Sequence, residues 1–157
     1  MESKINWCFK KAGAKLMPPN PNISSSFINL SKQTLKSAEL TLESKDLVWS
    51  TSMIYYAEYY ALYSFLTIVG IKCENHDCSI EIAEFLLDKK IDVNDIKKAR
   101  DLRIDAQYYL KTKSDAELHE ELNRAKIIVN NIINLTNKLT DDTVKDYRKR
   151  IIDTIKG

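Results

Sequence analysis

The longest weakly charged stretch of the chain spans residues 48–71, where Glu58 is the only formally charged side chain. At about 1.5 Å of rise per residue, a helix of this length can cross the roughly 30 Å apolar layer of a membrane. Serine, threonine and tyrosine hydroxyl groups are spread through it, however, and its tyrosines crowd the centre, whereas membrane-spanning helices concentrate aromatic residues near their ends. We therefore predict a helix that protein covers on most sides, either at the centre of a bundle or shared with a second subunit.

Apolar residues recur at helical spacing in several other segments. We expect bundle helices over residues 24–43, 48–70, 79–89, 93–110 and 114–139, followed by a last helix that begins at Thr140. The segment from Leu118 to Leu139 has the most regular pattern, because its apolar residues are separated alternately by four and three positions, as in a seam between neighbouring helices. Ser24 to Ser26 provide N-cap hydroxyl groups for the first bundle helix, and Gly70 is a C-cap glycine for the second.

The first residues differ from the bundle segments. Residues 1–16 fit a short amphipathic helix, and the run from Pro18 to Asn22 contains all three prolines of the chain. Proline lacks an amide donor and restricts the residue before it, so we expect this run to stop any helix. The sequence therefore divides into an N-terminal arm with a proline-rich linker, residues 1–23, which we expect to lie outside the core, and a single helical domain, residues 24–157.

Composition indicates the fold class. The 157 residues are enough for one domain with a substantial core, and 44% of them are hydrophobic, which is typical of soluble globular proteins. The chain has only three glycines and three prolines, fewer than strands joined by tight turns require. We predict an all-α, up-and-down bundle of about five helices, with a short N-terminal arm and a C-terminal helix.

Charge and cysteine content limit the partners and the compartment. The chain has 24 basic and 22 acidic side chains, a balance that argues against nucleic-acid binding over the whole surface but leaves local clusters open. Its N-terminus has no apolar core of a signal peptide. An odd number of cysteines, three, without the density of a disulfide scaffold indicates a reducing interior, so we expect a cytoplasmic protein.

Three motifs occur in a specific order. Residues 55–61 read Tyr-Tyr-Ala-Glu-Tyr-Tyr-Ala, residues 70–72 read Gly-Ile-Lys and precede His76 in the following loop, and residues 103–108 read Arg-Ile-Asp-Ala-Gln-Tyr. In this order and at these intervals, the set resembles the HEPN domain family, small helical proteins of archaea and bacteria. The resemblance covers roughly residues 25–139.

The resemblance implies a helical bundle that dimerises through its long helices. It also implies association with minimal nucleotidyltransferases, often as the toxin half of a toxin–antitoxin pair. Active ribonucleases of the family have an arginine followed, after four to six residues, by a histidine. Arg103 matches the arginine, but Tyr108 stands where the histidine falls at the shortest spacing, and Leu110 replaces a family tyrosine. These departures argue against nuclease activity.

Arg103 has two interpretations. Its rigid guanidinium fork suits a phosphate group or an RNA backbone across a dimer cleft. Alternatively it forms an ion pair with an acidic side chain such as Glu58 and fixes helix packing, which we favour because charged residues near cores are usually paired. Metal-independent RNA cleavage needs a base that works near neutral pH, a role that suits histidine better than tyrosine. The nucleotide- or RNA-binding candidates are Arg103, Tyr108 and His76.

The tyrosines of the long helix present a second choice. Aromatic residues at helical spacing can stack on bases, but more often they belong to a core or a subunit interface. The candidates for a two-fold dimer interface are Tyr55, Tyr56, Tyr59, Tyr60 and Tyr63.

The segment from Cys73 to Cys78 has three soft ligands without a clear fourth, so we predict no metal site and no cofactor. The basic residues of the last helix, including Arg148 and Arg150, read as a solvated charged face.

Two hypotheses from different classes follow. The first is a HEPN-type binding module, a homodimer that partners a nucleotidyltransferase and has no catalysis of its own. The alternative is an RNA-cleaving HEPN toxin that uses Arg103 without the usual histidine, with assistance from Tyr108 or His76. The missing histidine favours the first hypothesis.

Overall fold

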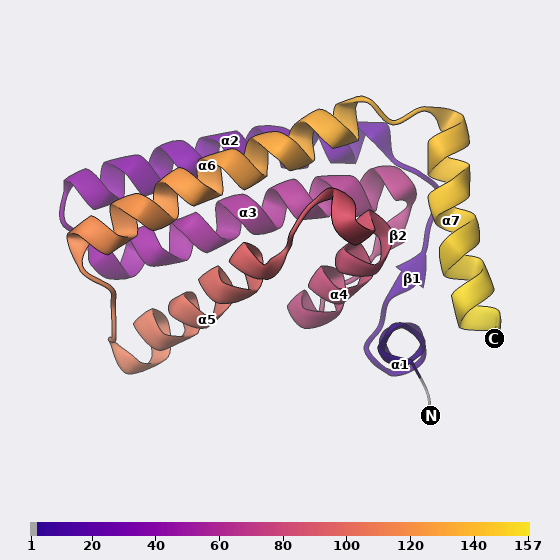
Figure 1. Cartoon of the computed structure of the whole chain (residues 1–157), viewed down its shortest axis with the longest axis horizontal. Helices are drawn as coiled ribbons and strands as arrows, with labels where there is room; N and C mark the ends of the chain where they lie inside the picture. The colour runs from indigo at the N-terminus through magenta and orange to yellow at the C-terminus, as the bar shows by residue number, and fades with distance from the viewer. Residues whose placement is uncertain (1–2) are drawn as a thin grey trace.

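The computed structural model describes residues 3–157 and confirms the all-α bundle (Figure 1). Helix α3 lies in the middle, with α2 and α6 on one side of it and α4 and α5 on the other, while α1 and α7 cover one end. The helices are α1 (Lys4–Lys11), α2 (Pro21–Glu43), α3 (Leu47–Val69), α4 (His76–Leu87), α5 (Asn94–Tyr109), α6 (Asp115–Asn137) and α7 (Asp141–Lys156). Two short strands, β1 (Lys15–Leu16) and β2 (Ile71–Lys72), and a 3₁₀ turn, η1 (Asp88–Lys90), connect them.

Helix α3 is buried on most sides by the rest of the chain, which is the environment its sequence predicts. Two serines of α2 face it and donate hydrogen bonds to its backbone, Ser24 to the carbonyl of Ser64 at 2.8 Å and Ser31 to the carbonyl of Ala57 at 2.6 Å. Because these side chains are short, the two helix backbones can pack closely. Among residues 3–157, no helix combines the length and the hydrophobicity needed to cross a lipid bilayer.

Two helices begin earlier than we predicted. Helix α2 begins at Pro21 instead of Ser24, because the side chain of Asn20 caps it and proline suits the first helical position, where no amide donor is needed. Helix α4 begins at His76 instead of Ser79, because the side chain of Asn75 accepts a hydrogen bond from the Cys78 amide at 3.0 Å. His76 is therefore a residue of the first helical turn and not of a loop.

The expectation that the first residues lie outside the core is wrong. Ile5, Cys8 and Ala14 are buried in the same hydrophobic cluster as the bundle helices. Strand β1 pairs antiparallel with β2, which extends α3 at its C-terminal end. The N-terminal segment thus covers one end of the bundle, and periodicity alone could not show these long-range contacts.

Cys8 and Cys78 form a disulfide, whereas we expected reduced cysteines. The bond joins α1 to the first turn of α4 across a sequence separation of 70 residues and leaves Cys73 as a buried thiol. Closing a loop of this length stabilises a fold by about 4 kcal/mol in the chain-entropy account. An odd cysteine count could not identify the pair, because pairing depends on where the fold places each residue.

The basic face of α7 is also more than a solvated surface. Arg148 donates to the carbonyls of Met17 and Val69, both at 2.8 Å, and Arg150 donates to the carbonyl of Leu86 at 3.0 Å. These contacts satisfy carbonyl groups at the C-terminal ends of α3 and α4, where the helix dipole favours a positive charge. The two arginines therefore hold α7 against the bundle.

We predict that Gly70→Ala destabilises the protein by about 1–3 kcal/mol. Gly70 has a φ of 88°, and a Cβ there would meet the Arg148 guanidinium and the Met17 carbonyl. Gly13→Ala is the matched control, since Gly13 has a φ of 80° but nothing within 4 Å of the added Cβ. Denaturant unfolding should show the larger loss for Gly70→Ala, and equal losses for the two variants would contradict the close packing of α7.

Candidate functional site

Arg103 lies on α5 with its guanidinium over the tyrosine rings of α3. Its Cζ is 5.0 Å from the ring centroid of Tyr55 and 5.6 Å from that of Tyr56. One terminal nitrogen donates to the Tyr56 hydroxyl at 3.4 Å and to the side-chain carbonyl of Gln107 at 3.1 Å. Within residues 3–157, no carboxylate lies within ion-pair distance of Arg103, and its buried Nε has no hydrogen-bond partner. Two aromatic rings, a hydroxyl group and a neutral amide therefore surround this cation.

The favoured ion pair between Arg103 and Glu58 is wrong. Glu58 is about 160° around α3 from Tyr56 and only about 60° from Tyr55, yet within residues 3–157 no ion pair joins its carboxyl group to Arg103. Its side chain is only 2% exposed, and the acidic groups of Asp95 and Glu121 are close enough to act on it electrostatically. Arg103 and Glu58 therefore occupy separate environments on α3.

His76 joins Arg103 on the same tyrosines. Its Nδ1 lies 2.8 Å from the Tyr55 hydroxyl, and its ring stacks on Tyr59 with the ring centroids 4.1 Å apart. Burial lowers the pKa of His76, and the nearby positive charge of Arg103 lowers it further. The imidazole is accordingly neutral at neutral pH, because its pKa falls below the ordinary value near 6.5.

The Tyr55 hydroxyl determines which imidazole nitrogen holds the proton. Burial raises the pKa of Tyr55 well above its ordinary range, so the hydroxyl stays protonated. A buried hydroxyl proton needs an acceptor, and Nδ1 of His76 is within hydrogen-bond distance. When Nδ1 accepts, a neutral imidazole has its proton on Nε2 and presents a donor to any ligand there. His76 is then arranged to donate a hydrogen bond, not to remove a proton.

An ion pair between α5 and α4 supports the position of His76. Arg100, one turn before Arg103, contacts the carboxylate of Asp77, the residue after His76. Tyr59 also donates to the hydroxyl of Ser79 at 3.2 Å. Both contacts attach the first turn of α4 to its neighbours. The missed signal was Asn75 three residues before Cys78, which is N-cap spacing and would have placed His76 at a helix start.

Tyr108, the third predicted site residue, lies outside this cluster. Its side chain is 72% exposed, five positions and about 140° around α5 from Arg103. Leu110, the last residue of the predicted helix over 93–110, is 78% exposed because α5 ends at Tyr109 and Leu110 adopts a left-handed conformation with a φ of 53°. The structure brings Arg103 and His76 together and leaves Tyr108 in solvent.

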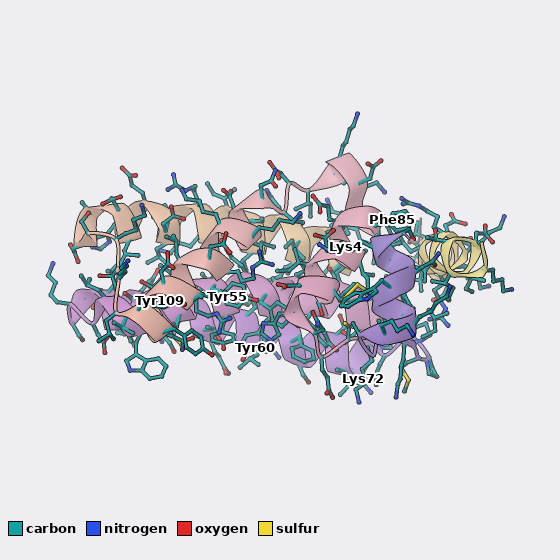
Figure 2. All side chains as sticks on the ribbon, turned by 90° about the horizontal axis from the view of Figure 1, so that it is seen from below. Lys4, Tyr55, Tyr60, Lys72, Phe85 and Tyr109 are labelled. Atoms are coloured by element: carbon teal, nitrogen blue, oxygen red, sulfur yellow. A yellow bond between two sulfur atoms is a disulfide. The ribbon has the colours of Figure 1, made fainter. Side chains whose placement is uncertain are left out.

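The five predicted interface tyrosines fall into two groups. Tyr55 and Tyr59 are buried by the chain itself, so they have almost no surface left for a second subunit. Tyr56, Tyr60 and Tyr63 are half-buried, and Phe27 of α2 packs against the last of them with ring centroids 4.9 Å apart. Figure 2 shows Tyr55 and Tyr60 near each other, with Tyr60 closer to the lower edge of the view. Of the five α3 tyrosines, which we call the tyrosine stripe, the half-buried Tyr56, Tyr60 and Tyr63 are therefore the ones that stay open to a partner or a ligand.

The segment from Cys73 to Cys78 does not present three free ligands. The sulfur of Cys78 is bonded to Cys8, and the imidazole of His76 is engaged with Tyr55. In the part of the chain that the structure describes, no three histidine, cysteine, aspartate or glutamate side chains are grouped to hold a metal ion.

Comparison with known families assigns the bundle that holds this site. The family model for the HEPN domain matches residues 24–139, most of the chain. This chain belongs to the HEPN family. Comparisons with curated proteins and with solved structures gave no match. Arg103 and His76 of this HEPN protein lie within the matched residues, whereas α1, β1 and α7 lie outside them.

Glu58 provides a test of the opposite side of α3. Burial raises its pKa well above the usual value of 4.5, and the charges of Asp95 and Glu121 raise it further. Burial alone would also raise the pKa of Glu121, but hydrogen bonds from Arg124 and Lys98 outweigh that effect and hold it low. Glu58 is therefore the group of this cluster that resists ionisation.

We predict that Glu58→Gln stabilises the protein at high pH. The folded state binds the Glu58 proton more tightly than the unfolded state, so wild-type stability falls as pH rises from about 4.5 through the folded-state pKa. Glutamine cannot ionise, so the variant should gain stability over the wild type across that window and match it below. Urea unfolding at several pH values measures this, with Glu120→Gln on the exposed face of α6 as the control. A constant difference at all pH values would contradict the assignment.

Proposed function

We propose that this HEPN protein is a binding module for nucleotide or RNA phosphate groups, centred on Arg103, and that it acts as a homodimer without catalysis of its own. In this proposal it works with a minimal nucleotidyltransferase, in a toxin–antitoxin-like system. The observation that carries the proposal is that the Arg103 cation rests on Tyr55 and Tyr56 with no carboxylate to neutralise it. Structural arginines at such depth are usually paired.

The surroundings of Arg103 favour an anion. The guanidinium offers several donors in a planar fork that matches a phosphate. One terminal nitrogen is engaged by Tyr56 and Gln107, and the aromatic rings beneath the guanidinium hold it in place. Nε2–H of His76 and the hydroxyl of the half-exposed Tyr56 add neutral donors nearby. A phosphate oxygen accepts from all three kinds of group, so the cluster is suited to a nucleotide or an RNA backbone.

The same geometry favours binding over cleavage. Removal of a 2′-hydroxyl proton needs an unprotonated acceptor near neutral pH. The neutral His76 brings the ribonuclease alternative back into consideration, because it lies beside Arg103 as a family histidine would. Its Nδ1, however, lies 2.8 Å from the protonated Tyr55 hydroxyl and is occupied when it accepts that hydrogen bond, and Tyr108 is exposed outside the cluster. The cluster therefore has donors for a phosphate and lacks a ready base.

Binding is tested with a fluorescent, mixed-sequence single-stranded RNA at fixed salt concentration. We predict that Arg103→Ala weakens its affinity about ten- to a hundred-fold, the range for losing charge-assisted hydrogen bonds. Arg124→Ala is the control, because it removes the same charge from α6, where Arg124 pairs with Glu121 at 2.7 Å. Equal effects of the two variants would show that only net charge matters and would contradict a site at Arg103.

Cleavage is measured on the same RNA in the presence of EDTA. The proposal expects no cleavage above that of buffer alone. Cleavage that disappears in His76→Ala and persists in Arg124→Ala would instead establish the ribonuclease alternative, with His76 in place of the missing family histidine.

The dimer is proposed from exposed apolar side chains at the C-terminal end of α5. Tyr108, Tyr109 and Leu110 are consecutive and largely exposed, and Trp49 is exposed in the first turn of α3. Clusters of large exposed apolar residues mark interfaces. The support for a nucleotidyltransferase partner is the family resemblance, and a short nucleotidyltransferase gene next to this one would strengthen it.

We predict that light scattering at micromolar concentration gives twice the mass of the chain, because a two-fold interface buries this end of α5 in both copies. Tyr109→Glu should shift the protein to the mass of one chain, since a carboxylate at the interface loses its hydration. Leu40→Glu, on the outer face of α2, should leave the mass unchanged. A single-chain mass for the wild type would remove the dimer from the proposal.

A further inference from the structure

A cavity of about 460 Å³ opens at the far end of the tyrosine stripe from Arg103. It is formed where the residues after β1 cross α2, α3 and β2, and its apolar walls include Met17, Ile23, Phe27 and Tyr63. Its volume is within the range of small-molecule sites, roughly 300–1,000 Å³. Lys72 adds a cation to the lining, and Glu74 lies next to that cation at 3.8 Å.

Aromatic rings connect the cavity to Arg103. Phe27 lies 6.1 Å from Tyr60, and Tyr60 lies 5.9 Å from Tyr56, whose ring is under the Arg103 guanidinium. From left to right, Figure 2 shows Tyr109, Tyr55, Tyr60 and Lys72 in turn, whereas Phe85 lies in the upper part of the view. We call the half-buried rings of Tyr56, Tyr60 and Phe27 the aromatic row. Such a row between two cations is the arrangement on which successive bases stack.

One polar group of the cavity is oriented by the fold. The Tyr63 hydroxyl accepts a hydrogen bond from the Cys73 amide at 3.0 Å, which leaves its own proton available to another acceptor. Burial raises the pKa of Tyr63, so this proton is retained at neutral pH. Ring nitrogens and carbonyl groups of nucleobases are acceptors of this kind. The cavity thus combines apolar walls, an aromatic face, a hydroxyl donor and a cation.

We infer that this cavity binds the aromatic base of a nucleotide, and that a single-stranded RNA held at Arg103 follows the aromatic row and places a base in it. The second part rests on the proposed function. Tyr56 and Tyr63 are seven positions apart on α3, about 10 Å along the helix. At about 3.4 Å for each stacked nucleotide, the path covers about three nucleotides. Residues 17–20, which line the cavity, lie outside the residues that the family model matches.

The probe is a tetranucleotide RNA with one terminal 2-aminopurine, a base whose fluorescence is quenched when it stacks on an aromatic ring. The wild type should quench it, and Phe27→Leu should abolish the quenching and weaken binding about ten-fold. Phe85→Leu is the matched control, because Phe85 is also half-buried but belongs to α4, where its ring packs under Arg150 of α7. Unchanged quenching and affinity in Phe27→Leu would overturn the inference.

A surface variant keeps the test valid if Phe27→Leu unfolds. Ile23 is 44% exposed and lines the cavity, so Ile23→Trp fills the entrance without altering the core. It should also reduce the affinity about ten-fold while the unfolding midpoint stays unchanged. Full RNA affinity with this tryptophan in place would overturn the inference.

Two further measurements distinguish binding of a free nucleotide from binding of RNA, and the cavity from the proposed RNA site at Arg103. Free 2-aminopurine nucleoside monophosphate should be quenched in a Phe27-dependent way, and if it alone is quenched, the RNA path is wrong. RNA binding that needs Arg103 but ignores Phe27 leaves the proposed function standing and refutes the cavity. Quenching that needs Phe27 with RNA affinity independent of Arg103 supports the cavity and refutes the proposed function.

Discussion

The constraint on which the structure depends is the burial of a 23-residue helix that carries five tyrosines. Each buried hydroxyl needs a hydrogen-bond partner, since an unsatisfied one costs about 1–3 kcal/mol. The connection from β2 into α4 supplies three partners: His76 for Tyr55, Ser79 for Tyr59 and the Cys73 amide for Tyr63. The requirement to satisfy α3 therefore determines where α4 begins, and with it the position of His76 beside Arg103.

The two sides of α3 handle charge differently. On one side Arg103 is charged and rests on aromatic rings at the edge of solvent; on the other Glu58 is enclosed, and burial raises its pKa so that the neutral acid is favoured. An ion pair between them would have neutralised both groups and left no cation for a ligand. Because no ion pair joins the two groups, the positive charge stays available where the open tyrosines are.

Local sequence signals predicted most of the helices because caps and apolar spacing act within a few residues. Gly70 ends α3 as predicted, and Ser114, at the predicted start of the fifth bundle helix, caps α6 in a capping box with Glu117. The failures involve contacts between distant segments. Nothing near Cys8 indicates a bond to Cys78, and nothing near Arg103 shows which face of α3 it meets. For the site, the sequence identified Arg103 and His76 but could not bring them together.

The segments outside the family match act together at one end of the bundle. Helix α1 is bonded to α4 through Cys8, β1 pairs with β2, and Arg148 of α7 binds the carbonyls where α3 ends. The first two attach to the connection that carries the tyrosine partners, and Arg148 fixes the end of α3 from which that connection leaves, so together they limit its movement relative to α3. This explains why a short N-terminal segment is part of the core: it holds the first turn of α4 in register with Arg103 and also builds the wall of the cavity beside Phe27.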